Sequence, residues 1–167
     1  FREENKLVNP KLEAQIARDK ITETETNLKN LRDNKNLLNN LKLKIKKGDL
    51  SAIGFKSSVD LSNRNASGLG PSKFDVADSD QSRFNEIINL EKQLSFARTK
   101  YKSSSIMITS LERKYNSLKP ELIQIQLNAA DKAIEVNEIS IKRTINNLEK
   151  IKKEFKLNPE IIKEFST

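Results

Sequence analysis

The fold is decided by residues 87–125, which read "IINLEKQLSFARTKYKSSSIMITSLERKYNSLKPELIQI". In this stretch, mostly apolar residues recur at alternating steps of three and four positions. They are Ile87, Leu90, Leu94, Ala97, Tyr101, Ser104, Ile108, Leu111, Tyr115, Leu118, Leu122 and Ile125. Because a helix turns once in about 3.6 residues, this spacing aligns them along one face, which we call the seam. The pattern predicts a left-handed coiled coil, with Ser104 as the plainly polar exception in the seam.

Two features divide the predicted helical region 82–157. Ser103–Ser105 can end one helix and cap the next, because serine side chains bond to nearby backbone amides. Pro120 has no amide hydrogen, so it must kink the helix or begin another. Beyond the seam, the apolar spacing changes register and continues in sevens. The later positions are Leu127, Ile134, Ile141, Leu148 and Phe155.

A first helix is predicted over residues 10–47. Asn9 is a suitable N-cap and Pro10 suits the first turn. Apolar residues follow along it at Leu12, Ile16, Ile21, Leu28, Leu31, Leu38, Leu41 and Ile45. The stretch "KLKIKKG" at residues 42–48 places cations in the last turn and a glycine beyond it, which are signals for a helix end.

The remaining segments complete a single predicted unit over residues 1–167. Residues 48–81 are rich in Ser, Asn and Gly, so we expect a long connector there. A short helix is expected over 159–165. The fold class is therefore all-α, either an elongated antiparallel coiled-coil hairpin or a three-helix bundle. An apolar seam is not left in water, so three options remain open: pairing within the chain, pairing with a neighbouring subunit, and pairing with parts of the protein outside this sequence.

Composition argues against chemistry at a dedicated site. The chain has no Cys and no His, which removes thiolate metal ligands and the usual general base. We expect no enzyme activity and no catalytic, cofactor-binding or metal-ligating residues. The net charge of +8 would suit nucleic acid, anionic lipid or an acidic polymer. A zipper-type DNA-binding protein carries basic residues just before its seam, whereas "VADSDQSRFNE" at residues 76–86 is acidic, so no nucleic-acid partner is expected.

Several stretches resemble the Wzz-like polysaccharide chain-length determinants, which include the GumC-type exopolysaccharide export proteins. "FREENKLVNPKLEAQ" at residues 1–15 is similar to the family's Phe-Arg-Glu-x-Asn-x-Leu-Val-Asp-Pro opening, with Asn9 where Asp is common. "LEKQLSFARTKYKSSSIMITSLERKYNSLKPEL" at residues 90–122 resembles the later segment in which a helix ends near a Tyr. Ser103–Ser105 stand where the family often has prolines. The resemblance covers residues 1–47 and 84–165.

The resemblance implies a non-catalytic periplasmic scaffold. It would belong to a bacterial inner-membrane protein that forms a homo-oligomer and regulates the length or export of a polysaccharide made by partner machinery. We expect the chain to be a piece of that protein, anchored through membrane segments outside this sequence. Two alternatives remain: the helical hairpin of a secretion membrane-fusion adaptor, and a cytoplasmic structural coiled coil.

Overall fold

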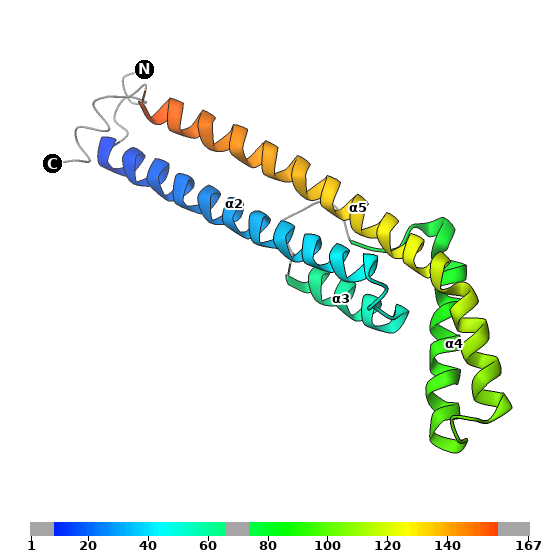
Figure 1. The fold of residues 1–167 in the computed structure, drawn as a ribbon. Helices are drawn as coiled ribbons and strands as arrows, with labels where there is room; N and C mark the ends of the chain where they lie inside the picture. The colour runs from blue at the N-terminus through cyan, green and yellow to red at the C-terminus, as the bar shows by residue number, and fades with distance from the viewer. Residues whose placement is uncertain (1–8, 66–73, 157–167) are drawn as a thin grey trace. The chain divides into compact units, whose positions relative to one another are not determined.

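The computed structural model describes residues 9–65 and 74–156, and it is all-α over these residues. Figure 1 shows helices α2 (Pro10–Lys46), α3 (Ala52–Asn65), α4 (Gln81–Lys100) and α5 (Ile106–Lys156), with a short 3₁₀ turn, η1 (Asp78–Asp80), before α4. The predicted all-α class is confirmed for these residues. The helix expected over 159–165 lies outside them, as do residues 1–8 of the family-like opening.

The chain divides into two compact units, which we describe separately. The first unit combines Phe1–Asp33 with Glu138–Thr167, and the second unit is Asn34–Asn137. Helices α2 and α5 each contribute residues to both units.

Helix α2 begins where the sequence predicted. The Lys11 amide donates to Asn9 Oδ1 at 2.9 Å, and the Glu13 amide donates to the Asn9 carbonyl at 3.0 Å. Asn9 is therefore an N-cap, and Pro10 occupies the first helical position, where its missing amide hydrogen costs nothing.

The end of α2 is also as predicted. Gly48 has φ +72°, and its amide donates to the Ile45 carbonyl at 2.9 Å. The Asp49 amide donates to the Lys44 carbonyl at 3.2 Å. Together these bonds form a Schellman motif, in which a left-handed residue satisfies the last carbonyls of a helix.

Replacing Gly48 tests this helix end. Gly48→Ala should lower the free energy of unfolding by about 1–2 kcal/mol, because φ is positive there. Steric crowding is not the main cause of this loss, since the nearest atom to an added Cβ is Lys119 Cε at 3.4 Å. Gly48→Asn should lose less, because Asn tolerates this conformation. Chemical denaturation of both variants measures the difference, and equal losses would contradict the assignment.

In the first unit, parts of α2 and α5 run in opposite directions beside each other (Figure 1). Glu25 on α2 pairs with Lys152 on α5 at 3.5 Å. The apolar residues that this unit buries are Ala14, Leu28, Leu31, Leu148 and Ile151. Three of them, Leu28, Leu31 and Leu148, had been predicted to lie on apolar faces.

The beginning of α2 departs from its predicted apolar face. Leu12 and Ile16 are 53% and 56% exposed, whereas Ala14 between them is fully buried. The apolar spacing had predicted the two larger side chains as the inward positions. The buried position near this end is instead a residue small enough for close helix packing.

The second unit holds the larger core, built from four helices. Phe55 on α3 lies at its centre with 0% exposure and makes edge-to-face contacts with Phe74 and Phe84 at ring distances of 5.6 and 6.0 Å. Ile45 from α2 and Leu122 from α5 are also buried in this cluster. The core therefore joins segments that are far apart in the sequence.

Helix α3 corrects the expected connector over 48–81. Its composition, "AIGFKSSVDLSNRN", favours turns, but Ala52, Phe55 and Val59 share one face at steps of three and four and all are buried. Near the end of the helix, the Asn63 side chain exchanges two hydrogen bonds of 2.9 Å with the backbone of Phe74. Tertiary contacts thus override weak local propensity here.

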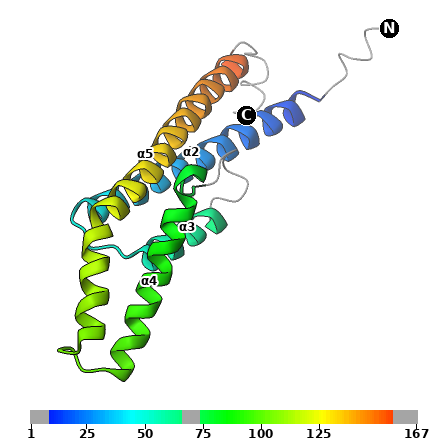
Figure 2. The ribbon, with the colours of Figure 1, turned by 90° about the vertical axis from the view of Figure 1, so that its right-hand side faces the viewer.

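Helices α4 and α5 form a hairpin in the second unit (Figure 2). The serine run, one of the two possible breaks in the sequence, separates them: Ser105 Oγ accepts from the Met107 amide at 3.1 Å, and the Ser105 carbonyl accepts from the Thr109 amide at 3.0 Å. Pro120 lies inside α5 and does not end it. The helix bends in the yellow-green stretch that contains this proline (Figures 1 and 2), as expected from the lost amide.

Candidate functional site

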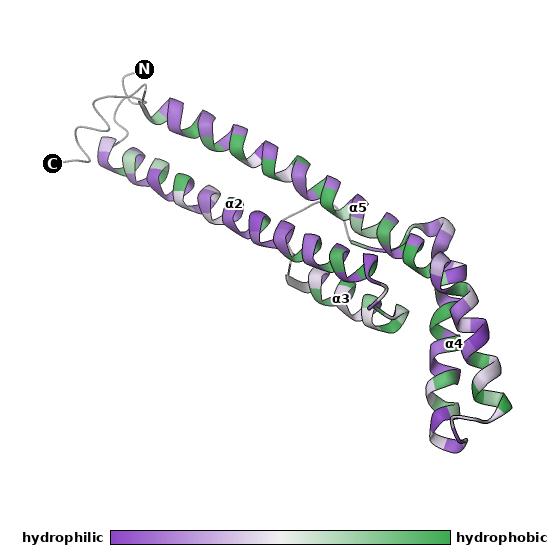
Figure 3. Cartoon of the chain, in the orientation of Figure 1, coloured by the Kyte–Doolittle hydropathy of each residue, from purple (hydrophilic) through white to green (hydrophobic). Residues whose placement is uncertain are grey.

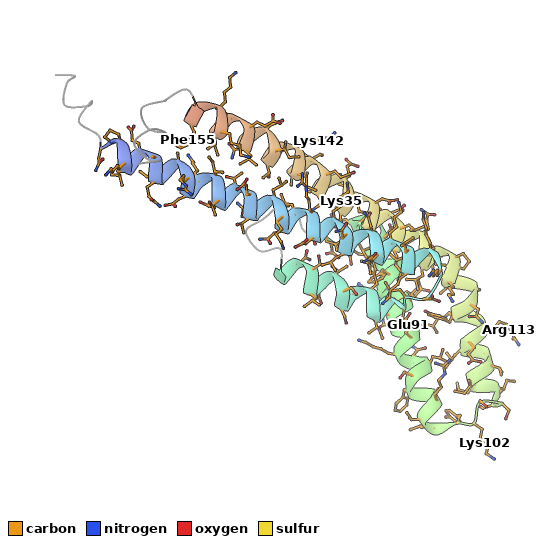
Figure 4. All side chains as sticks on the ribbon, turned by 60° about the vertical axis from the view of Figure 1, so that its left-hand side comes forward. Lys35, Glu91, Lys102, Arg113, Lys142 and Phe155 are labelled. Carbon is orange, nitrogen blue, oxygen red and sulfur yellow. The ribbon has the colours of Figure 1, made fainter. Side chains whose placement is uncertain are left out.

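The candidate site is an open groove of about 460 Å³ in the second unit. It lies where the start of α3 meets the hairpin of α4 and α5. Its lining residues are Ser51, Ile53, Glu91, Leu94, Arg98, Glu112, Tyr115 and Asn116. Glu91 on α4 lies next to the beginning of α3 (Figure 4).

Glu91 joins three helices through one carboxylate. Its Oε2 accepts from the Ala52 amide at 2.7 Å, and its Oε1 accepts from the Ile53 amide at 2.9 Å. The Tyr115 hydroxyl donates to Oε2 at 2.7 Å. A carboxylate at a helix N-terminus is stabilised by the unpaired amides and by the helix dipole.

The start of α3 is thereby fully satisfied. Ser51 Oγ accepts from the Gly54 amide at 2.9 Å, and the Ser51 carbonyl accepts from the Phe55 amide at 2.9 Å. With Glu91 on the two preceding amides, each of the first four amides of the helix has an acceptor. The cap of α3 is therefore shared between a local serine and a distant glutamate.

The environment of Tyr115 favours its neutral form. Burial raises the pKa of the Tyr115 hydroxyl well above its usual value, and the hydrogen bond to Glu91 and the negative charge of Glu91 raise the pKa further. The phenol therefore remains a hydrogen-bond donor to Glu91 far into the alkaline range.

A pH titration tests this contact. The folded-state pKa of Tyr115 lies above its unfolded value of 10.0, so the stabilisation is fully present below pH 10.0 and is lost as pH rises toward the folded pKa. Wild-type stability should therefore fall between pH 10.0 and that pKa, and Tyr115→Phe should flatten the dependence in this window. In a Tyr101→Phe background, phenolate absorbance reports Tyr115 alone. A midpoint at pH 10.0 would contradict the geometry.

The groove is built to hold helices together. Glu91 is already engaged by two amides and a phenol, and Arg98 pairs with Glu112 at 3.0 Å across the hairpin. Arg83 likewise pairs with Glu121 at 3.0 Å. These contacts fix the positions of α3, α4 and α5 relative to one another within the second unit.

The structure distributes the predicted seam over two facing helices. Leu94 and Ala97 on α4 pack with Ile108 and Leu111 on α5 in one cluster. The other members in the larger core are Ile87, Tyr115, Leu118, Leu122 and Ile125, and Leu90 is also buried. One sequence stripe therefore supplies both sides of a hairpin.

Tyr101 is a correction to the predicted seam. It is 47% exposed, and its backbone is extended (φ −122°, ψ 155°) at the C-cap of α4. The helix ends at Lys100, so the three-and-four spacing no longer places Tyr101 on the apolar face of a helix. Ser104, in the same turn, is exposed as well.

Two residues important to this site were not singled out from the sequence. Glu91 looked like an ordinary surface glutamate beside Leu90. Gln126 on α5 is fully buried, and its Nε2 donates to the carbonyls of Leu50 and Ser51 at 3.0 and 3.3 Å. For Gln126, the sequence did offer a signal, because a glutamine stands there beside Ile125 on an apolar helix face.

Among residues 9–65 and 74–156, no group of three or more His, Cys, Asp or Glu gathers as metal ligands would. In the same part of the chain, none of the helices combines the length and apolar content needed to cross a bilayer. Comparison of the chain with protein-family models, curated proteins and solved structures gives no significant match.

Proposed function

We propose that this chain is the non-catalytic periplasmic scaffold region of a membrane-anchored polysaccharide co-polymerase. In this role it regulates the chain length or the export of a surface or extracellular polysaccharide. The proposal rests on the resemblance of residues 1–47 and 84–165 to the Wzz-like and GumC-type proteins, and on the all-α fold of the described residues.

The structural observation that carries the proposal is that the Glu91 carboxylate is bonded to two neighbouring helices. This carboxylate lines the groove, yet its acceptors are occupied by the start of α3 and by Tyr115. Polar groups in the groove thus hold helices in place, as a scaffold requires. The buried and half-buried positions at steps of three and four further support antiparallel coiled-coil pairing of α4 with α5.

The proposed partners follow from the same role. The intact protein would form a homo-oligomer and work with a polysaccharide polymerase or export machinery, held to the membrane by segments outside this sequence. Exposed apolar residues on α2, such as Leu37 at 65% and Leu43 at 57%, are available for contacts with a neighbouring subunit.

A gene deletion in the source bacterium tests this function. Loss of the intact protein should change the length distribution or the exported amount of one polysaccharide, seen on gels of surface glycans. The intact protein carrying Ile108→Asp should fail to restore it, because Ile108 is 1% exposed and an unpaired charge there disrupts the hairpin. Thr109→Asp, at the neighbouring exposed position, should restore it.

Unchanged glycans after the deletion would reject the proposal. The full-length gene also separates the alternatives. Flanking lipoyl-like β segments would favour the membrane-fusion adaptor, and a full-length chain without membrane spans would favour a cytoplasmic coiled coil.

A further inference from the structure

The turn between α4 and α5 exposes an unusual set of side chains. We define residues 96–107, the end of α4, the turn and the start of α5, as the hairpin tip. Phe96 is 61% exposed, Tyr101 47%, Ile106 85% and Met107 46%. Hydrophobic residues at the start of α5 are visible beside the turn in Figure 3. Four large apolar or aromatic side chains are therefore open to solvent within twelve positions.

The same region and its flanks carry a net positive charge. From Lys92 to Leu111 the sequence has four cations and no carboxylate. Arg98 pairs with Glu112, which lies just beyond this range. Lys102 extends from the turn (Figure 4), and Lys100 Nζ lies 4.8 Å from the centre of the Phe96 ring. The tip thus combines exposed apolar groups with lysines that have long apolar stems.

The turn presents these groups on a fixed backbone. The Tyr101 amide donates to the Ala97 carbonyl at 2.8 Å, and the Ser105 amide donates to the Lys102 carbonyl at 2.9 Å. Beneath the turn, Leu94, Ala97 and Ile108 are buried against one another. A surface that is already ordered loses less entropy when it binds.

We propose that the hairpin tip docks on an anionic lipid bilayer. Aromatic and aliphatic side chains surrounded by lysines are the composition of elements that lie in a membrane interface. The lysines attract anionic headgroups while their stems reach over apolar surface, and the Phe96, Ile106 and Met107 side chains enter the boundary below. The opposite charge of the headgroups matches the net positive charge of the tip. This inference is independent of the proposed function, because it uses only the charge and exposure of residues 92–111.

A single tryptophan reports this docking directly. The chain has no Trp, so Phe96→Trp places the one such fluorophore at the tip. Its emission should shift to the blue with vesicles of phosphatidylcholine and phosphatidylglycerol, and not with phosphatidylcholine alone. Added salt should reverse the shift, because it screens attraction between exposed charges. Leu61→Trp, at a 58% exposed position on α3, should show no shift.

Matched variants measure the two contributions in vesicle co-sedimentation. Ile106→Asn should weaken partitioning about tenfold, since it removes an apolar side chain from the interface. Lys100→Glu with Lys102→Glu should also weaken partitioning at least about tenfold. The controls Leu61→Asn and Lys46→Glu with Lys47→Glu change an exposed apolar residue on α3 and two exposed cations at the end of α2, and should leave partitioning unchanged.

Three results would overturn the proposal. The first is that the chain partitions to neither type of vesicle, which would favour an acidic protein as the partner of the tip. The second is equal partitioning to both vesicles, or equal losses in the tip and control variants. The third is a lipid-free blue shift of the Phe96→Trp chain that grows with protein concentration, which would identify a second copy as the occupant. Helical circular dichroism of each variant establishes that it is folded.

Discussion

Phe55→Ala should lower the free energy of unfolding by about 4 kcal/mol. The ring is fully buried and contacts Phe74 and Phe84 at 5.6 and 6.0 Å, so truncation leaves a cavity that three separate segments line. The aromatic contacts are lost in addition to the transfer of the side chain from water. Chemical denaturation followed by circular dichroism measures the loss.

The chain offers a matched control for this substitution. Phe96→Ala removes the same atoms from a ring that is 61% exposed, so its cost should stay below about 1 kcal/mol. The substitution also removes the contact of that ring with Lys100, whose Nζ lies 4.8 Å from the ring centre. Similar losses for the two variants would mean that the core is not centred on Phe55.

Glu91→Ala should cost about 3 kcal/mol, although the side chain is only half-buried. It removes the acceptors of the Ala52 and Ile53 amides and leaves the Tyr115 hydroxyl without its partner. Denaturation should show the stability loss, and hydrogen exchange should show faster exchange at the first two amides of α3.

Another glutamate of the same groove controls for charge removal. Glu112→Ala breaks an exposed ion pair with Arg98, which is worth at most about 1 kcal/mol. Glu91→Gln should fall between the two, because an amide keeps one acceptor oxygen but cannot serve all three donors. If Glu91→Ala were as mild as Glu112→Ala, the cap would not stabilise the fold.

Local signals explain which helix ends could be predicted. Asn9, Gly48 and Ser105 act on backbone groups within five residues of themselves, so their roles follow from adjacent sequence. The turn at Ser103–Ser105 was among the open possibilities for the same reason. Whether Pro120 would kink α5 or end it was not decidable locally, because packing on both sides determines whether the helix continues.

Helix α3 could not be predicted because its support is distant. Its serines, asparagines and glycine disfavour a helix, and the buried positions Ala52, Phe55 and Val59 mark its inner face. The carboxylate that caps it belongs to Glu91, which comes 39 positions after Ala52 and 38 positions after Ile53. The candidate site depends on the same contact, so the sequence showed Tyr115 as an inward residue but not Glu91 as its partner.

The shared cap has a consequence for synthesis on the ribosome. Residues 52–65 are synthesised before residue 91 is added, so at that stage the amides at the start of α3 have no Glu91 carboxylate to accept their hydrogen bonds. Water must solvate this segment until α4 arrives and the hairpin closes. Helix α4 is therefore needed to complete α3, and a translational pause before residue 91 would hold the nascent protein in a state lacking α3.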